Sequence, residues 1–185
     1  SPELKEEDIS AFKKNILDSG YSPKSILPHA GYLINPASPN EEMADKSFNL
    51  FMDEGQRVVR LGLETINIHP GAYKEGSMED GIKRCSLMVD RVLEEVPGLK
   101  IALENTAGAG TIIGSKFEEL DAILSEIKNK DRVGFTLDTA HLFGAGYDVK
   151  GDPDGVLDSF FSRFGEDKLF GMHLNDSKVP LSSNK

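Results

Sequence analysis

The sequence contains six residues that could bind a metal ion, and five of them recur at intervals of 34 to 40 positions. They are His29, His69, Glu104, Asp138, His141 and His173, and they include all four histidines of the chain. Imidazole and carboxylate ligands together suit zinc, manganese or iron better than calcium or magnesium, which favour oxygen. Six ligands exceed the four of one tetrahedral ion, which indicates more than one ion, with a carboxylate such as Glu104 shared. Clustered ions suit the hydrolysis of phosphate esters.

Each of these residues also has a plainer interpretation. A single histidine at the end of a strand is more often a hydrogen-bonded structural residue than a ligand. Glu104 and Asp138 could similarly cap helices or form salt bridges. Because all four histidines fall at one predicted rim, at strand ends or, for His141, three positions after Asp138, a metal site is favoured over a random scatter.

The five regularly spaced residues each follow a short apolar segment that is predicted as a buried strand. These segments are residues 25–28, 65–68, 100–103, 133–137 and 169–172. The stretches between them have apolar residues at helical spacing, clearest at Ile82, Cys85, Val89, Val92, Leu93 and Val96. Ser115-x-x-Glu118 fits a capping box at the start of another helix.

Strands that alternate with helices imply parallel pairing, and a spacing of roughly 35 residues suits a (β/α)8 TIM barrel. Eight such units need about 250 residues, so about five strands and their helices are expected here. A doubly wound sheet is the alternative, but it normally has a glycine-rich turn after its first strand, and none is present. In a barrel the five residues would share the C-terminal rim, and His141 would reach the same cavity from the following loop.

Composition and length indicate one globular domain over residues 1–185 without a membrane span. Hydrophobic residues make up 38% of the chain, and no apolar run approaches the roughly 18 residues that cross a bilayer. Cys85 is the only cysteine, which excludes an intramolecular disulfide and a cysteine-rich zinc finger. The net charge of −10 argues against nonspecific coating of nucleic acid, although bound cations would reverse the field within an acidic cleft.

Five phrases of the sequence closely resemble the endonuclease IV family, and they occur in the family's order. They are Ile26-Leu27-Pro28-His29-x-x-Tyr32-Leu33-Ile34-Asn35, Asn67-Ile68-His69-Pro70-Gly71, Glu104-Asn105-Thr106-Ala107-Gly108-x-Gly110, Asp138-Thr139-x-His141 and Gly171-Met172-His173-Leu174-Asn175-Asp176. Each phrase alone is weakly specific, but five in order are highly specific. The resemblance covers nearly the whole chain and implies a barrel of the xylose isomerase-like superfamily.

This resemblance implies a zinc-dependent deoxyribonuclease of base excision repair. The enzyme would use a metal-activated hydroxide to cleave double-stranded DNA on the 5′ side of an abasic site, leaving a 3′-hydroxyl. Up to three zinc ions are implied, with the first held by His29 and His69, Glu104 bridging to the second, Asp138 and His173 on the second, and His141 on the third. Glu104 and Asp138 would be catalytic as electrostatic organisers rather than as nucleophiles.

Tyr32 and Leu33 match residues on a family loop that enters the DNA and helps to extrude the abasic nucleotide. An apolar wedge of this kind is physically reasonable, because a nucleotide without its base is cheaper to unstack. The alternative is that both residues continue the strand into the core, and for Leu33 the two interpretations are about equal.

The family's remaining metal ligands are not found before Lys185, so the native protein is expected to extend beyond both ends. Two other functions stay open: a sugar isomerase or epimerase that holds one ion with Glu104, Asp138 and His173, and a catalytically silent DNA-binding fragment. An intracellular, monomeric protein is expected, cytoplasmic in a bacterium and nuclear or organellar in a eukaryote.

Overall fold

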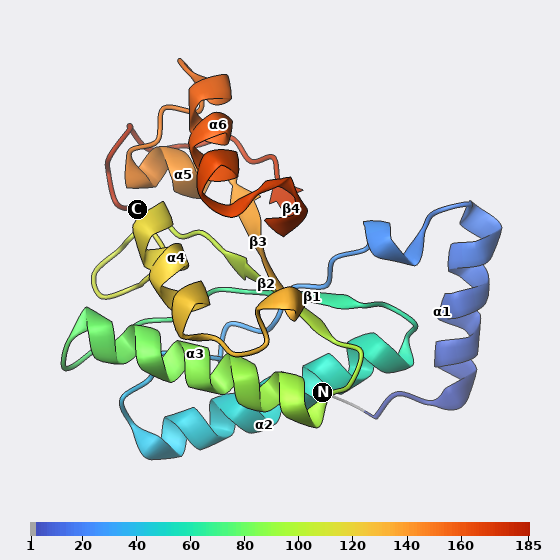
Figure 1. Ribbon diagram of the computed structural model, residues 1–185. Coiled ribbons are helices and arrows are strands. Elements are labelled where there is room, and N and C mark those ends of the chain that lie inside the picture. The colour runs from blue at the N-terminus through green and yellow to red at the C-terminus, as the bar shows by residue number, and fades with distance from the viewer. Residues whose placement is uncertain (1–2) are drawn as a thin grey trace.

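The computed structural model describes residues 3–185, and its centre is a four-stranded parallel sheet (Figure 1). The strands lie side by side in chain order: β1 (Thr65–Ile68), β2 (Lys100–Glu104), β3 (Val133–Asp138) and β4 (Leu169–His173). A doubly wound sheet reverses its strand order at a switch point. The unbroken order here is that of an arc of a (β/α)8 barrel, as predicted.

Helices that connect the strands pack against one another in succession, α2 on α3, α3 on α4 and α4 on α6. Figure 1 shows α1 apart from this layer. Three single 3-10 turns occupy Pro23–Ser25, Lys130–Arg132 and Glu166–Lys168. The helices are α1 (Glu6–Ser19), α2 (Glu41–Arg60), α3 (Met78–Glu95), α4 (Phe117–Glu126), α5 (Thr139–Ala145) and α6 (Pro153–Phe164). Within residues 3–185 each helix is too short or too polar to cross a bilayer.

Alternation along the strands separates an apolar face from a face of small and polar residues. The apolar side chains are buried in the main core with the helices: Ile66, Ile68, Ile101, Leu103, Val133, Phe135 and Leu137. The predicted stripe of α3 lies in the same core. The other face has Asn67 beside Ala102 on β2, and Glu104 beside Thr136 on β3. The same periodicity that builds the core therefore turns Glu104 and Asp138 away from it.

The first predicted strand, residues 25–28, is wrong as a regular strand. The segment lies beside β1 through a single parallel bridge, in which the Asn67 amide donates to Pro28 O and the Ala30 amide donates to Asn67 O. The next bridge towards the N-terminus would need an N–H from residue 28, and proline has none. Pro28 thus ends the ladder but leaves His29 beside β1.

Two local predictions also need correction. Residues 139–145 form α5, so His141 lies in the first turn of a short helix and not in a loop. Ser115 does not cap α4, which begins at Phe117 after Lys116. Instead, the Glu119 carboxylate accepts hydrogen bonds from the backbone amides of Gly114 and Ser115, at 2.7 and 2.9 Å. The capping box fails because the carboxylate that satisfies these amides lies one residue later than predicted.

Candidate metal centre

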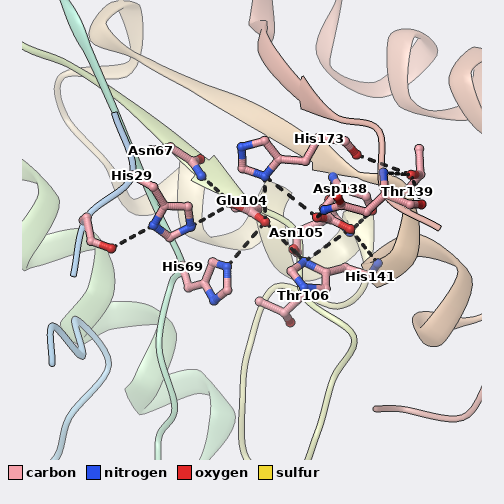
Figure 2. Close-up of polar contacts among 12 residues, drawn as sticks. His29, Asn67, His69, Glu104, Asn105, Thr106, Asp138, Thr139, His141 and His173 are labelled. Carbon is pink, nitrogen blue, oxygen red and sulfur yellow. Dashed lines mark hydrogen bonds and ion pairs between the residues drawn. The ribbon is translucent and has the colours of Figure 1, made fainter. Parts of the chain in front are cut away.

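Four imidazoles surround the carboxylate of Glu104 (Figure 2). His29 Nε2 lies 3.1 Å from Oε2, while His69 Nε2, His141 Nδ1 and His173 Nδ1 lie 3.4, 3.3 and 3.2 Å from Oε1. The histidine side chains are about one third exposed, whereas Glu104 is 1% exposed. A buried anion is therefore enclosed by nitrogen donors that remain open to solvent.

Two groups of side chains within residues 3–185 have ligand atoms close enough to hold a metal ion. One consists of His29, His69 and Glu104, and the other of Glu104, Asp138 and His173; within each group the ligand atoms lie within 4.8 Å of one another. Glu104 belongs to both groups, so the arrangement agrees with the expected sharing of this carboxylate.

His141 belongs to neither group. Its Nδ1 lies 3.0 Å from the backbone oxygen of Asn105 and 3.9 Å from Asp138 Oδ1. The structure thus brings all six predicted ligands to one rim, but it places His141 at the edge of the two ligand groups.

Strand ends position these ligands. Glu104, Asp138 and His173 are the last residues of β2, β3 and β4, and Asp138 pairs with His173 in the sheet register. His69 directly follows β1. Asp138 also caps α5, with Oδ1 accepting from the His141 amide at 2.9 Å. The capping interpretation of Asp138 is therefore confirmed, and its second oxygen remains directed at His173, 3.8 Å away.

The hydrogen bonds of His29 show why the centre fits a cation. Its Nδ1 donates to its neighbour's oxygen, Ala30 O, at 2.7 Å, which leaves Nε2 with a lone pair towards Glu104 Oε2. Two acceptors can face each other at 3.1 Å only with a proton or a metal ion between them. Four imidazoles around one carboxylate cannot all be protonated, because their charges would repel. The donor set therefore fits divalent cations.

Without metal, protons take this role and shift the pKa values of the centre. Hydrogen bonding to Glu104 is the main cause that raises the pKa of His29 and of His141 above 6.5, although burial opposes it. Burial alone would raise the pKa of Glu104, but hydrogen bonds from His141, His29, His69 and Asn67 together hold it far below 4.5. Metal binding must therefore displace protons, and acid should weaken it.

The metal-free protein is expected to lose stability as pH rises above about 6.5. The raised pKa of His29 contributes stability that is complete below 6.5 and is lost as pH passes the folded value. The lowered pKa of Glu104 contributes above 4.5 and is lost in acid. Melting curves in chelator should show the fall, and saturating zinc should reverse it. A chelated protein that becomes more stable over this range would contradict the His29–Glu104 pairing.

Sequence reasoning missed the asparagines that support the ligands. Asn67 Nδ2 donates to Glu104 Oε2, and Asn175 Nδ2 donates to Asp138 Oδ2 at 2.5 Å. Asn105 Oδ1 accepts from the Asp138 amide at 2.7 Å. A usable signal existed, because each asparagine lies within two positions of a ligand in the quoted phrases. Their side-chain direction could not be read from spacing alone.

Tyr32 and Leu33 lie on a turn and are 99% and 76% exposed, which excludes the alternative that they continue the strand into the core. They border a pocket of about 370 Å³ that is also lined by His29, His69 and Lys74. Two apolar side chains thus project from the wall of a cavity that includes two of the candidate ligands. Their contact with DNA stays a prediction.

Comparison with known proteins gives one family and a consistent set of relatives. The model of the Xylose isomerase-like TIM barrel family matches residues 1–185. Probable endonuclease 4 of Chlorobium limicola is 42% identical over 186 residues, which cover 99% of this chain and 64% of the relative. Apurinic-apyrimidinic endonuclease 1 of Saccharomyces cerevisiae is 37% identical over 190 residues, with 100% and 51% covered.

Solved structures agree with this result. Endonuclease IV from Thermus thermophilus superimposes with a TM-score of 0.83 at 32% identity, covering 100% of this chain and 64% of that one. A D-tagatose 3-epimerase-like protein reaches 0.74 at 20% identity, covering 93% and 62%, and shows the fold alone. The resemblance to endonuclease IV is confirmed. The chain spans between half and two thirds of the length of these relatives.

Proposed function

The chain belongs to the Xylose isomerase-like TIM barrel family, and on that premise we propose that it provides the metal-binding residues of a DNA-repair endonuclease. The protein would cleave double-stranded DNA on the 5′ side of abasic sites and leave a 3′-hydroxyl. Zinc is the expected cofactor, with manganese and iron as alternatives of similar ligand preference. Relatives named endonuclease 4 and apurinic-apyrimidinic endonuclease support the reaction class.

The single observation that carries the proposal is the shared carboxylate with imidazoles on both sides. A sugar isomerase or epimerase needs one ion, for which Glu104, Asp138 and His173 suffice. It would leave His29 and His69 without a role, although they form a second ligand group with the same carboxylate. Two adjacent groups favour a multinuclear centre, which suits in-line displacement at a phosphate.

The chain's own residues would hold the ions and fix their environment. Bound divalent ions would supply Lewis-acid activation of water and neutralise charge that develops on the phosphate oxygens. His29 and His69 would take one side of Glu104, and Asp138 with His173 the other. The Nδ1 hydrogen bond of His29 keeps Nε2 available as a ligand. Glu104 and Asp138 would act through their charge and not as nucleophiles. Both carboxylates would be bound to the ions and so would not be free to attack phosphorus.

Lesion recognition would use the exposed turn beside this centre. Replacing Tyr32 and Leu33 together by alanine should weaken binding to abasic DNA about 10-fold, since base stacking on such side chains contributes about 1–3 kcal/mol. Metal content should not change, because neither residue is a ligand. Fluorescence anisotropy with abasic and intact duplexes measures the effect.

Leu17 and Tyr21 provide the matched control, as a leucine and a tyrosine that are 77% and 69% exposed and do not line the pocket. Their double replacement by alanine should leave binding unchanged. Equal losses of binding to abasic DNA in the two double variants would contradict the role assigned to the turn.

The proposed reaction is tested with a duplex that contains one abasic analogue and with the same duplex undamaged. The metal-loaded protein should nick only the damaged duplex, next to the lesion, and the product end should be extendable by a polymerase because it has a 3′-hydroxyl. Lesion binding without nicking would favour the silent fragment. Isomerisation of a ketose without nicking would favour the sugar enzyme.

A further inference from the structure

Asn67 connects the segments that provide the first ligand group. Its backbone amide donates to Pro28 O, and its backbone oxygen accepts from the Ala30 amide, both at 2.8 Å. These two bonds hold His29 in place from either side. His69 follows two residues later on the same strand end. The side chain of Asn67 then reaches the third ligand, because Nδ2 donates to Glu104 Oε2 (Figure 2).

The contact with Glu104 also orients the carboxylate. With Oε2 held by Asn67 and facing His29, Oε1 is left facing His69, His141 and His173. Rotation about the last side-chain bond of glutamate is soft, so a carboxylate without a fixed partner samples a broad range of angles. One amide donor thus fixes the orientation in which Oε2 faces His29 and Oε1 faces the other three imidazoles.

The chain retains this asparagine at a cost. Asn67 is 0% exposed, and its Oδ1 is buried without a hydrogen-bond partner within the described part of the chain. A buried polar atom without a partner destabilises the fold, whereas an apolar side chain of the same size would avoid that cost. This cost offsets what the Nδ2 hydrogen bond to Glu104 contributes, so net stability alone does not explain the residue.

We propose that Asn67 is a positioning residue that aligns Glu104 so that its two oxygens serve two metal ions at once. The inference rests on the proposed metal centre and goes beyond it, because it concerns a residue that is not a ligand. Loss of the amide should leave the imidazoles in place but release the shared carboxylate. Loss of such outer contacts typically lowers metal affinity by about 10- to 100-fold.

Asn67→Leu is the informative substitution, since it keeps the side-chain size and removes both the Nδ2 donor and the unpartnered Oδ1. Asn175→Leu is the matched control: the same change removes an amide that donates to Asp138, which belongs to the second ligand group alone. Asn67→Ala is the second variant, for use if leucine does not fit, because alanine is smaller than asparagine.

Manganese(II) alone is the probe, added to each metal-free protein and followed by calorimetry and electron paramagnetic resonance. Two manganese ions joined by one carboxylate give an exchange-coupled spectrum, while isolated ions give six lines. The parent protein should bind two ions and show coupling. Asn67→Leu should lose the coupling and bind at least one ion about 10- to 100-fold more weakly. Asn175→Leu should weaken the second ion and leave the affinity of the first unchanged.

Thermal melting separates positioning from a purely structural role. Metal-free Asn67→Leu should melt near the parent temperature, because removal of the unpartnered Oδ1 offsets the loss of the Nδ2 hydrogen bond to Glu104. A coupled spectrum together with parental affinity in Asn67→Leu would overturn the role of Asn67 but not the proposed function. If leucine prevents folding, the same result in Asn67→Ala would have this meaning. A parent protein that binds no manganese would instead remove the metal centre and with it the proposed function.

Discussion

Glu104→Gln is expected to lower nicking of abasic DNA by at least about 1000-fold. Within residues 3–185 Glu104 is the one residue common to the two ligand groups, so the loss of its charge weakens both ions together. A loss of about 4 kcal/mol of transition-state stabilisation corresponds to this factor, at about 1.4 kcal/mol per tenfold change in rate. Single-turnover nicking and metal analysis of the same preparation measure the effect.

The fold should tolerate this substitution. Glutamine has almost the same size, and its amide oxygen can still accept the hydrogen bond from Asn67 Nδ2, although the pairing of the charge with the histidines is lost. His69→Ala is the comparison, because His69 belongs to one ligand group only and its loss should leave the second group intact. Glu104→Gln protein with parental metal content and parental nicking would contradict the assignment of Glu104 as the shared ligand.

Removal of the metal ions is the second change with a large expected effect. Exhaustive chelation should abolish nicking and lower the melting temperature, since ligand binding to the folded state adds stability. At free zinc about 100 times Kd, one ion contributes about 2.7 kcal/mol, which corresponds to about 5–10 °C for a domain of this size. Added zinc should restore both properties.

The control for chelation is the protein in magnesium. Imidazole-rich centres prefer zinc, manganese or iron, so magnesium should restore neither nicking nor the melting temperature. Nicking that survives chelation, or full recovery with magnesium alone, would contradict a centre built on His29, His69 and His173.

The spacing of chemistry-bearing residues predicted most of the fold and the six candidate ligands that meet at one rim. Four of the five predicted strands are present, because each combines an apolar run with a polar residue at or just after its C-terminal end. The position of these polar residues relative to the strands correctly predicted that Glu104, Asp138 and His173 meet on one rim of the sheet. Parallel strands in chain order bring such ends together whatever the separation in sequence.

The features that were missed depend on single backbone hydrogen bonds or on side-chain direction. Pro28 removes one N–H from the ladder, a detail that hydrophobic pattern does not report. The helix after β3 spans only Thr139–Ala145, too short for a clear apolar period. Asn67 belongs to the site through its contact with Glu104, which no motif describes.

Anomalous diffraction at the zinc absorption edge tests the central claim most directly. Crystals of the zinc-loaded protein should give at least two neighbouring peaks, one among Glu104, His29 and His69 and another among Glu104, Asp138 and His173. Their separation should leave Glu104 within ligand distance of both. A map without a peak at this rim, or with one peak that leaves His29 and His69 unbound, would contradict the account.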